Sequence, residues 1–178
     1  MKKLFLFLIV AINFTFCTKA PESQPAEEIK YKLVQPPDQT AMNISVDFLD
    51  SSKLKARLWA KVAKVYFARS ETLLFDSIRV EFFSSRTGRR QSTLTCDSAK
   101  INDRTKDMYA FGKVLVVADS PKTIVRTTFL EWRNKTQRLY SNEFIEIITP
   151  DEEIRGYGFE SDVNLSNYKI FKVSGVKK

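Results

Sequence analysis

The chain has 178 residues, of which 43% are hydrophobic and 12% aromatic, enough for one packed domain and an export segment. It contains no histidine, which excludes the commonest general base, the usual metal ligand and every histidine-dependent triad. The formal net charge of +8 fits an anionic partner such as a phosphorylated lipid, and it also fits strand faces that are merely solvated. Composition therefore favours a binding protein over an enzyme.

The first residues have the composition of an export signal. Lys2 and Lys3 precede an apolar stretch over 4–16, which is shorter than the roughly 20 residues that span a bilayer. Cys17 ends this stretch, where a bacterial lipoprotein carries its acylated cysteine. We predict that residues 1–17 are a signal peptide or a lipoprotein or membrane anchor, with Cys17 as the lipidation site. Plain secretion is the third alternative, and all of them place the folded part outside the cytoplasm.

The next segment has the composition of a linker. Residues 18–42 are rich in Pro, Glu, Ser and Gln and show no sustained periodicity. Such a composition is typical of a flexible tether. We therefore predict a tether over 18–42 and a folded domain over 43–178.

The body of the chain has the pattern of β-strands. From Leu54 to Val62 apolar and charged residues alternate, and this period of two predicts a half-buried antiparallel strand. At Val62 and Ala63 the apolar set changes parity, which predicts a bulge or a bend. The alternation recurs down the chain between turn signals, and no segment carries a convincing helical stripe. The sequence predicts an all-β fold.

An internal repeat accompanies this alternation. The pattern LxAxxAKV over 58–65 returns as LxCxxAKI over 94–101 and more loosely as VxTxxLEW over 125–132. A repeat of this length indicates one supersecondary unit stacked on copies of itself, here a hairpin. Stacked hairpins form either a closed sandwich with a dry core or an open jelly-roll with a groove, and the pattern does not choose between them.

No group of side chains points to catalysis or to metal binding. The carboxylates fall mainly in turns or on outward strand positions, and the acidic run 151–153 lacks the spacing of a calcium loop. Cys96 takes the repeat position of Ala60 and Thr127, which indicates a small packed side chain rather than a nucleophile. We predict no enzymatic activity, no cofactor and no metal, and an exported chain is not expected to bind nucleic acid.

The closing part of the chain reads IRGYGFESD over 154–162 and YKIFKVSG over 168–175. It resembles the closing motif of the LptC family, the periplasmic component of the lipopolysaccharide-export machinery. The family's other strand motifs occur here in the same order: the LxAxxA strand at 58–63, Gly112-Lys113-Val114, Leu130-Glu131-Trp132 and Ser141-Asn142. The resemblance covers about residues 46–175 and rests on the order and spacing of these motifs together.

This resemblance implies a fold and a role. The fold would be an open antiparallel β-jelly-roll whose apolar groove takes the lipid A acyl chains of lipopolysaccharide. One end of the roll would dock on the inner-membrane lipopolysaccharide ABC exporter. The other end would pass cargo to a periplasmic jelly-roll bridge protein by edge-to-edge strand addition. The protein is therefore expected in the periplasm, anchored to the inner membrane.

Strand parity and repeat equivalence select the residues expected to line the groove. They are Leu58, Ala60, Val80, Phe82, Leu94, Cys96, Val114, Val116, Val125, Ile145, Ile147 and Phe159. Gly156 and Gly158 are expected to allow a close backbone approach near the partner-docking end. Two other functions fit the strand pattern: a cell-envelope lipoprotein with a closed β-sandwich that binds protein or glycan, and an assembly module whose repeats supply edges for polymerisation.

Overall fold

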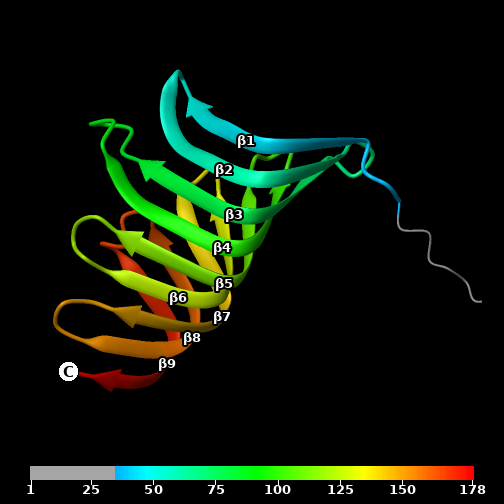
Figure 1. Cartoon of the computed structure of the whole chain (residues 1–178). Helices are drawn as coiled ribbons and strands as arrows, with labels where there is room; N and C mark the ends of the chain where they lie inside the picture. Colours follow the sequence, from blue (N-terminus) through cyan, green and yellow to red (C-terminus); the bar gives the residue numbers. More distant parts are fainter. Residues whose placement is uncertain (1–34) are drawn as a thin grey trace, which may run out of the picture. The chain divides into compact units, whose positions relative to one another are not determined.

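The computed structural model describes residues 35–178. Every regular secondary-structure element in this range is a β-strand (Figure 1). The strands pair antiparallel in chain order and form one sheet, which confirms the all-β prediction. The strands are β1 (Gln39–Asp50), β2 (Lys53–Tyr66), β3 (Glu71–Phe83), β4 (Arg90–Asn102), β5 (Met108–Ala118), β6 (Ile124–Arg133), β7 (Arg138–Ile148), β8 (Glu153–Asp162) and β9 (Tyr168–Lys177).

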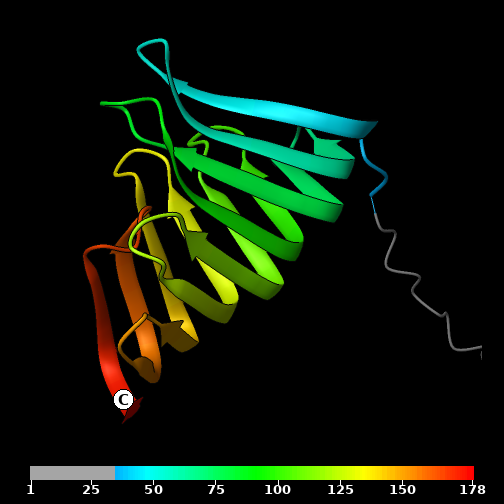
Figure 2. The same cartoon turned by 60° about the vertical axis from the view of Figure 1, so that its left-hand side comes forward.

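The sheet is open. Strand β1 pairs only with β2, and β9 pairs only with β8, so the two terminal strands lie at opposite ends of the stack (Figure 2). The predicted open, jelly-roll-like arrangement is confirmed, and its connections are simple hairpins. The first strand begins at Gln39, inside the segment 18–42 that the sequence predicts to be a tether. The predicted anchor over 1–17, with Cys17, lies outside the described residues.

A line of irregularities crosses the middle of the sheet. The pairing register shifts near residues 59–62 of β2, 75–78 of β3, 95–98 of β4, 111–114 of β5, 127–131 of β6 and 141–144 of β7. Register shifts of this kind bend strands and increase their twist. The strands curve over this line, so that the two halves of the sheet face each other (Figure 1). The bend predicted at Val62 and Ala63 is therefore confirmed for β2.

We call the two halves the first limb and the second limb. The first limb consists of residues 44–59, 78–95, 114–127, 144–157 and 172–177. The second limb consists of residues 39–42, 62–75, 98–111, 129–141 and 159–170.

The Gly-Lys-Val motif lies at the bend in β5. Gly112 has a φ of 91°, and a Cβ on it would lie 2.3 Å from Oδ2 of Asp97 on β4. The same Asp97 oxygen accepts a hydrogen bond of 3.0 Å from the backbone N–H of Lys113. Only glycine accommodates both the positive φ and the close carboxylate, which explains this residue at this place.

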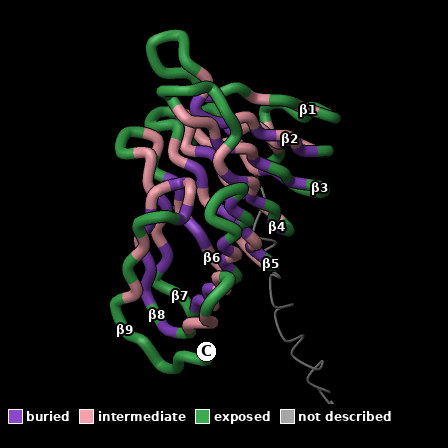
Figure 3. The backbone as a smooth tube through the Cα atoms, turned by 90° about the vertical axis from the view of Figure 1, so that its left-hand side faces the viewer, coloured by how far each residue is buried: buried purple, intermediate pink, exposed green. Residues whose placement is uncertain are grey.

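The inner faces of the two limbs form one hydrophobic core. The buried positions run through the strands, whereas β9, the turns and most of β1 are largely exposed (Figure 3). Strands β2 to β8 contribute alternate residues on either side of the bend, because successive side chains of a strand point to opposite faces. The fold thus presents a continuous apolar surface on its inner side.

Candidate functional site

The structure places all twelve predicted groove residues in the interior. Each has at most 9% of its surface exposed, and all belong to the hydrophobic core cluster. Most come from the first limb, and Ala60, Cys96 and Phe159 lie at or near the bend. Their burial agrees with the inward parity used to select them, while contact with lipid stays a prediction.

The second limb supplies the opposite wall, which the sequence-based selection left out. Its main buried residues are Ala63, Leu74, Ala99, Ile101, Met108, Ala110, Leu130, Trp132 and Leu139. The repeat carried the signal for several of them, since Ala63, Ala99 and Leu130 occupy the same repeat position. Phe48 on β1 was also left out, because the alternation used for the selection begins at Leu54.

Aromatic contacts join the two walls. The Trp132 ring of the second limb lies 5.2 Å from the Phe48 ring in an edge-to-face arrangement, and 5.5 Å from the Phe82 ring. Both phenylalanines belong to the first limb, so the cluster bridges the interior. Pairs of this geometry contribute about 0.5–1.5 kcal/mol beyond the area they bury. An acyl chain that enters here must therefore displace side chains or separate the limbs.

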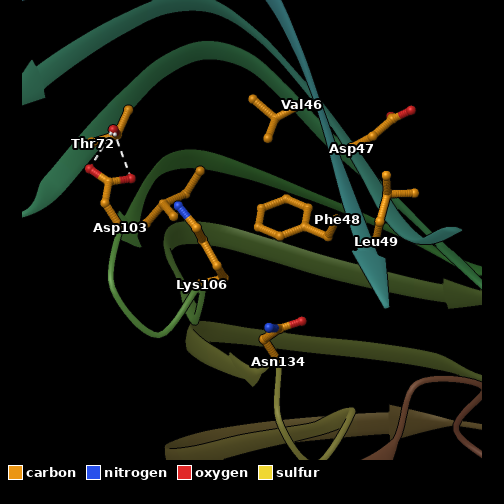
Figure 4. A pocket seen from close by; sticks show the side chains of 9 residues that line it. Val46, Asp47, Phe48, Leu49, Thr72, Asp103, Lys106 and Asn134 are labelled. Atoms are coloured by element: carbon orange, nitrogen blue, oxygen red, sulfur yellow. Dashed lines mark hydrogen bonds between the residues drawn. The ribbon is translucent and has the colours of Figure 1, made fainter. Parts of the chain in front are cut away.

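A cavity of about 370 Å³ opens between the limbs at the β1 end (Figure 4). One side consists of residues 46–49 of β1, from which the Phe48 ring projects toward the side that carries Lys106 and Asn134. On the second limb, Thr72 donates a hydrogen bond of 3.0 Å to Asp103. The volume falls within the ~300–1,000 Å³ of small-molecule pockets. This cavity is the candidate entrance to the interior.

The buried thiol has no reactive environment. Burial raises the pKa of Cys96 to about 12, so the thiolate is scarce at neutral pH. Cys96 therefore packs as a small apolar residue, as its repeat position predicts. Within residues 35–178, no cluster of three or more cysteine or carboxylate side chains is placed to hold a metal ion.

The two glycines assigned to partner docking lie beneath β9. A Cβ on Gly156 would lie 2.3 Å from the carbonyl oxygen of Lys172, and one on Gly158 would lie 2.6 Å from the ring of Phe171. Gly158 also has a φ of 75°. The structural effect of these glycines is to let β9 pack closely on β8. An effect on partner docking stays a prediction, and such an effect would depend on the position of β9.

The free edges expose apolar side chains. On β9, Phe171, Val173 and Val176 are each more than half exposed, and on β1 the same holds for Met42 and Leu49. Each terminal strand also has one side without a neighbouring strand among residues 35–178. Unpaired strand edges are natural sites for adding a strand from another chain.

These features define an open-sheet β-protein with an apolar interior, an architecture suited to holding long apolar molecules. The family described as lipopolysaccharide-assembly, LptC-related, matches residues 4–176, nearly the whole chain, and the chain belongs to this family. A search of the curated proteins found no match.

Membership of this family assigns a process and a compartment. The protein takes part in lipopolysaccharide transport, on the periplasmic side of the cell envelope, within a family of transport and binding proteins. Within the described residues, no helix of a length and hydropathy that would span a membrane was found.

Proposed function

We propose that the protein is a relay for lipopolysaccharide. It receives the lipid from an inner-membrane ABC exporter, holds the lipid A acyl chains between its two limbs, and passes them to the next periplasmic jelly-roll protein. The observation that carries the proposal is the continuous apolar inner face of a sheet that stays open at both ends. Family membership supports the choice of lipopolysaccharide as cargo.

The inner face supplies the affinity without a reaction. Each methylene removed from water is worth about 0.8 kcal/mol, so a chain of many methylenes is held by contact alone. The energy for transport would come from ATP hydrolysis by the exporter, since the sequence carries no phosphate-binding loop. The relay itself therefore only has to bind the lipid and release it to the next protein.

Attachment and docking complete the proposal. Residues 1–17, with Cys17 at their end, would anchor the chain to the inner membrane, and residues 18–42 would act as the tether for the domain over 43–178. The edge strands β1 and β9 would dock the exporter and the bridge protein by strand addition. Gly156 and Gly158 would support this docking by holding β9 on β8.

Photo-crosslinking in inner-membrane vesicles that contain the exporter tests the proposal. A photoreactive residue replaces Val80, which is fully buried on the inner face of β3, and in a control it replaces the neighbouring Arg79, which pairs with Glu81 on the outer face. We expect lipopolysaccharide adducts at position 80 that require ATP, and few adducts at position 79. Adducts at neither position in a folded protein would contradict the proposed relay.

A further inference from the structure

One buried donor in the interior has no partner within residues 35–178. The indole Nε1 of Trp132 finds no hydrogen-bond acceptor among residues 35–178, although the residue is only 1% exposed. A buried N–H without an acceptor is costly, and nearly all such groups in native proteins are paired. The site therefore keeps a donor that the described part of the chain does not use.

This donor lies close to the β1-end cavity, the candidate entrance. Phe48 lines the cavity between the limbs and also packs edge-on against the Trp132 ring at 5.2 Å. The cavity therefore ends one side chain away from the indole. Phe48 lies on a terminal strand with a neighbour on one side only, and the register of β1 shifts between Phe48 and Leu49. Moving Phe48 therefore disturbs fewer contacts than moving a residue of a central strand.

The surroundings of the indole define what it can bind. Trp132 packs against both Phe48 and Phe82, so a ligand at this place must be mostly apolar. An indole N–H donates and cannot accept, so the same ligand must bring an acceptor oxygen. An acyl chain joined through an ester or amide meets both conditions, because its carbonyl is an acceptor at the end of an apolar chain.

We propose that Trp132 Nε1 is the polar anchor of the interior and binds the ester or amide carbonyl of an acyl chain that enters through the β1-end cavity after Phe48 moves aside. This assignment rests on the proposed function, and it deepens it by naming the chemical group that is recognised. The apolar walls hold any alkyl chain, whereas the indole distinguishes chains that carry a carbonyl.

The test deletes the N–H and keeps the shape of the side chain. Trp59 and Trp132 are the two tryptophans of the chain, so a Trp59→Phe background leaves one site for a tryptophan analogue in which sulfur replaces the indole N–H. Two ligands are compared by displacement of a fluorescent lipopolysaccharide: purified lipopolysaccharide, and a long-chain alkyltrimethylammonium salt, whose cation has no hydrogen-bond acceptor. Thermal unfolding of both proteins without ligand shows that the analogue preserves the fold.

We expect the analogue to weaken lipopolysaccharide binding by about three- to tenfold, the contribution of one neutral hydrogen bond, and to leave binding of the alkyltrimethylammonium salt unchanged. Equal lipopolysaccharide affinity with and without the N–H would overturn the anchor, and so would an equal loss for both ligands. Failure of the unsubstituted protein to bind lipopolysaccharide would instead overturn the proposed function, on which the anchor depends.

Discussion

The two terminal strands are both free edges, yet they contact the interior in different ways. Strand β1 inserts Phe48 between the limbs, where it is 5% exposed and touches Trp132. Strand β9 leaves Val173 and Val176 more than half exposed, although their partners Gly156 and Ile154 place them toward the inner side. Strand β1 therefore covers the apolar interior with its own side chain, whereas at the other end the buried Val163 and Leu165 of the turn before β9 do so, and β9 itself stays exposed.

Charge differs between the edges as well. The acidic residues of β1 are Asp47 and Asp50, and this strand has no lysine or arginine. Strand β9 has Lys169, Lys172 and Lys177 and no acidic residue. Opposite charges steer association and suppress wrong partners, so the two edges are suited to different docking partners. A chain with two unlike edges can occupy a fixed place in a series, whereas a chain with two like edges cannot.

Removing the Phe48 side chain of β1 should have the largest effect on stability. Phe48→Ala deletes a buried aromatic side chain and should cost about 3–5 kcal/mol of unfolding free energy. The adjacent Leu49→Ala serves as the matched control, since Leu49 is 61% exposed and should change stability by no more than about 0.5 kcal/mol. Urea denaturation measures both. Equal effects would show that β1 is not closed onto the interior.

Displacing β9 from β8 should have the second-largest effect on stability. Gly156→Val places a side chain where the carbonyl of Lys172 lies, and we expect a loss of about 1–3 kcal/mol together with fast amide exchange in β9. Gly175→Val is the control, because nothing lies within 4 Å of a Cβ at that position. Slow exchange in β9 of the Gly156→Val protein would mean that this glycine is not needed for β9 to pack.

Reversing one charge on the β9 edge tests the electrostatic difference. Lys172→Glu should slow association with a partner that docks on β9, by several-fold at low salt and less at high salt. Lys122→Glu, in the turn between β5 and β6, makes the same change in net charge away from both terminal strands. Crosslinked complex formed at early times is the measurement. The same decrease in both variants would indicate a general charge effect and remove the distinction between the edges.

The smallest expected effect is the pH dependence of stability that comes from Asp47 on β1. Asp47 accepts hydrogen bonds of 2.6 and 2.8 Å from the Arg57 guanidinium, which holds the pKa of this carboxyl below its usual 3.8. The folded form therefore binds this proton less readily than the unfolded chain does. The stabilisation is present above pH 3.8 and is lost as the pH falls through the lowered pKa of the folded state.

Asp47→Asn should therefore lower the urea midpoint slightly at pH 7 and leave it unchanged near pH 2 relative to the parent. Asp151→Asn, in an exposed turn, is the control. A difference between Asp47→Asn and the parent that stayed constant with pH would show that the ion pair does not contribute to stability.

The repeat explains why the sequence predicts so much of the fold. In LxAxxA the first two apolar residues are two apart and the last two are three apart, so both pairs face inward only if an extra residue is inserted between them. The structure has its register shifts at this place in β2, β4 and β6. The same motif therefore encodes both the inner face and the bend.

Other features depend on contacts that no local pattern contains. Phe48 is buried between the limbs because the bend brings β1 opposite Trp132, which is far away in sequence. The role of Gly156 depends on β9, which approaches from the other side of a hairpin. Periodicity assigns a residue to one face of the sheet. Which residues it meets on the opposite limb depends on the bend, and the local pattern does not predict them.

The central claim is that acyl chains lie on the inner face of the sheet. Val116 and Val117 are neighbours on β5, of the same residue type, and are 0% and 37% exposed. A photoreactive residue placed at each position in cells should give lipopolysaccharide adducts at 116 and almost none at 117. Equal adducts at both positions, or adducts at 117 alone, in a folded and exported protein would contradict the account.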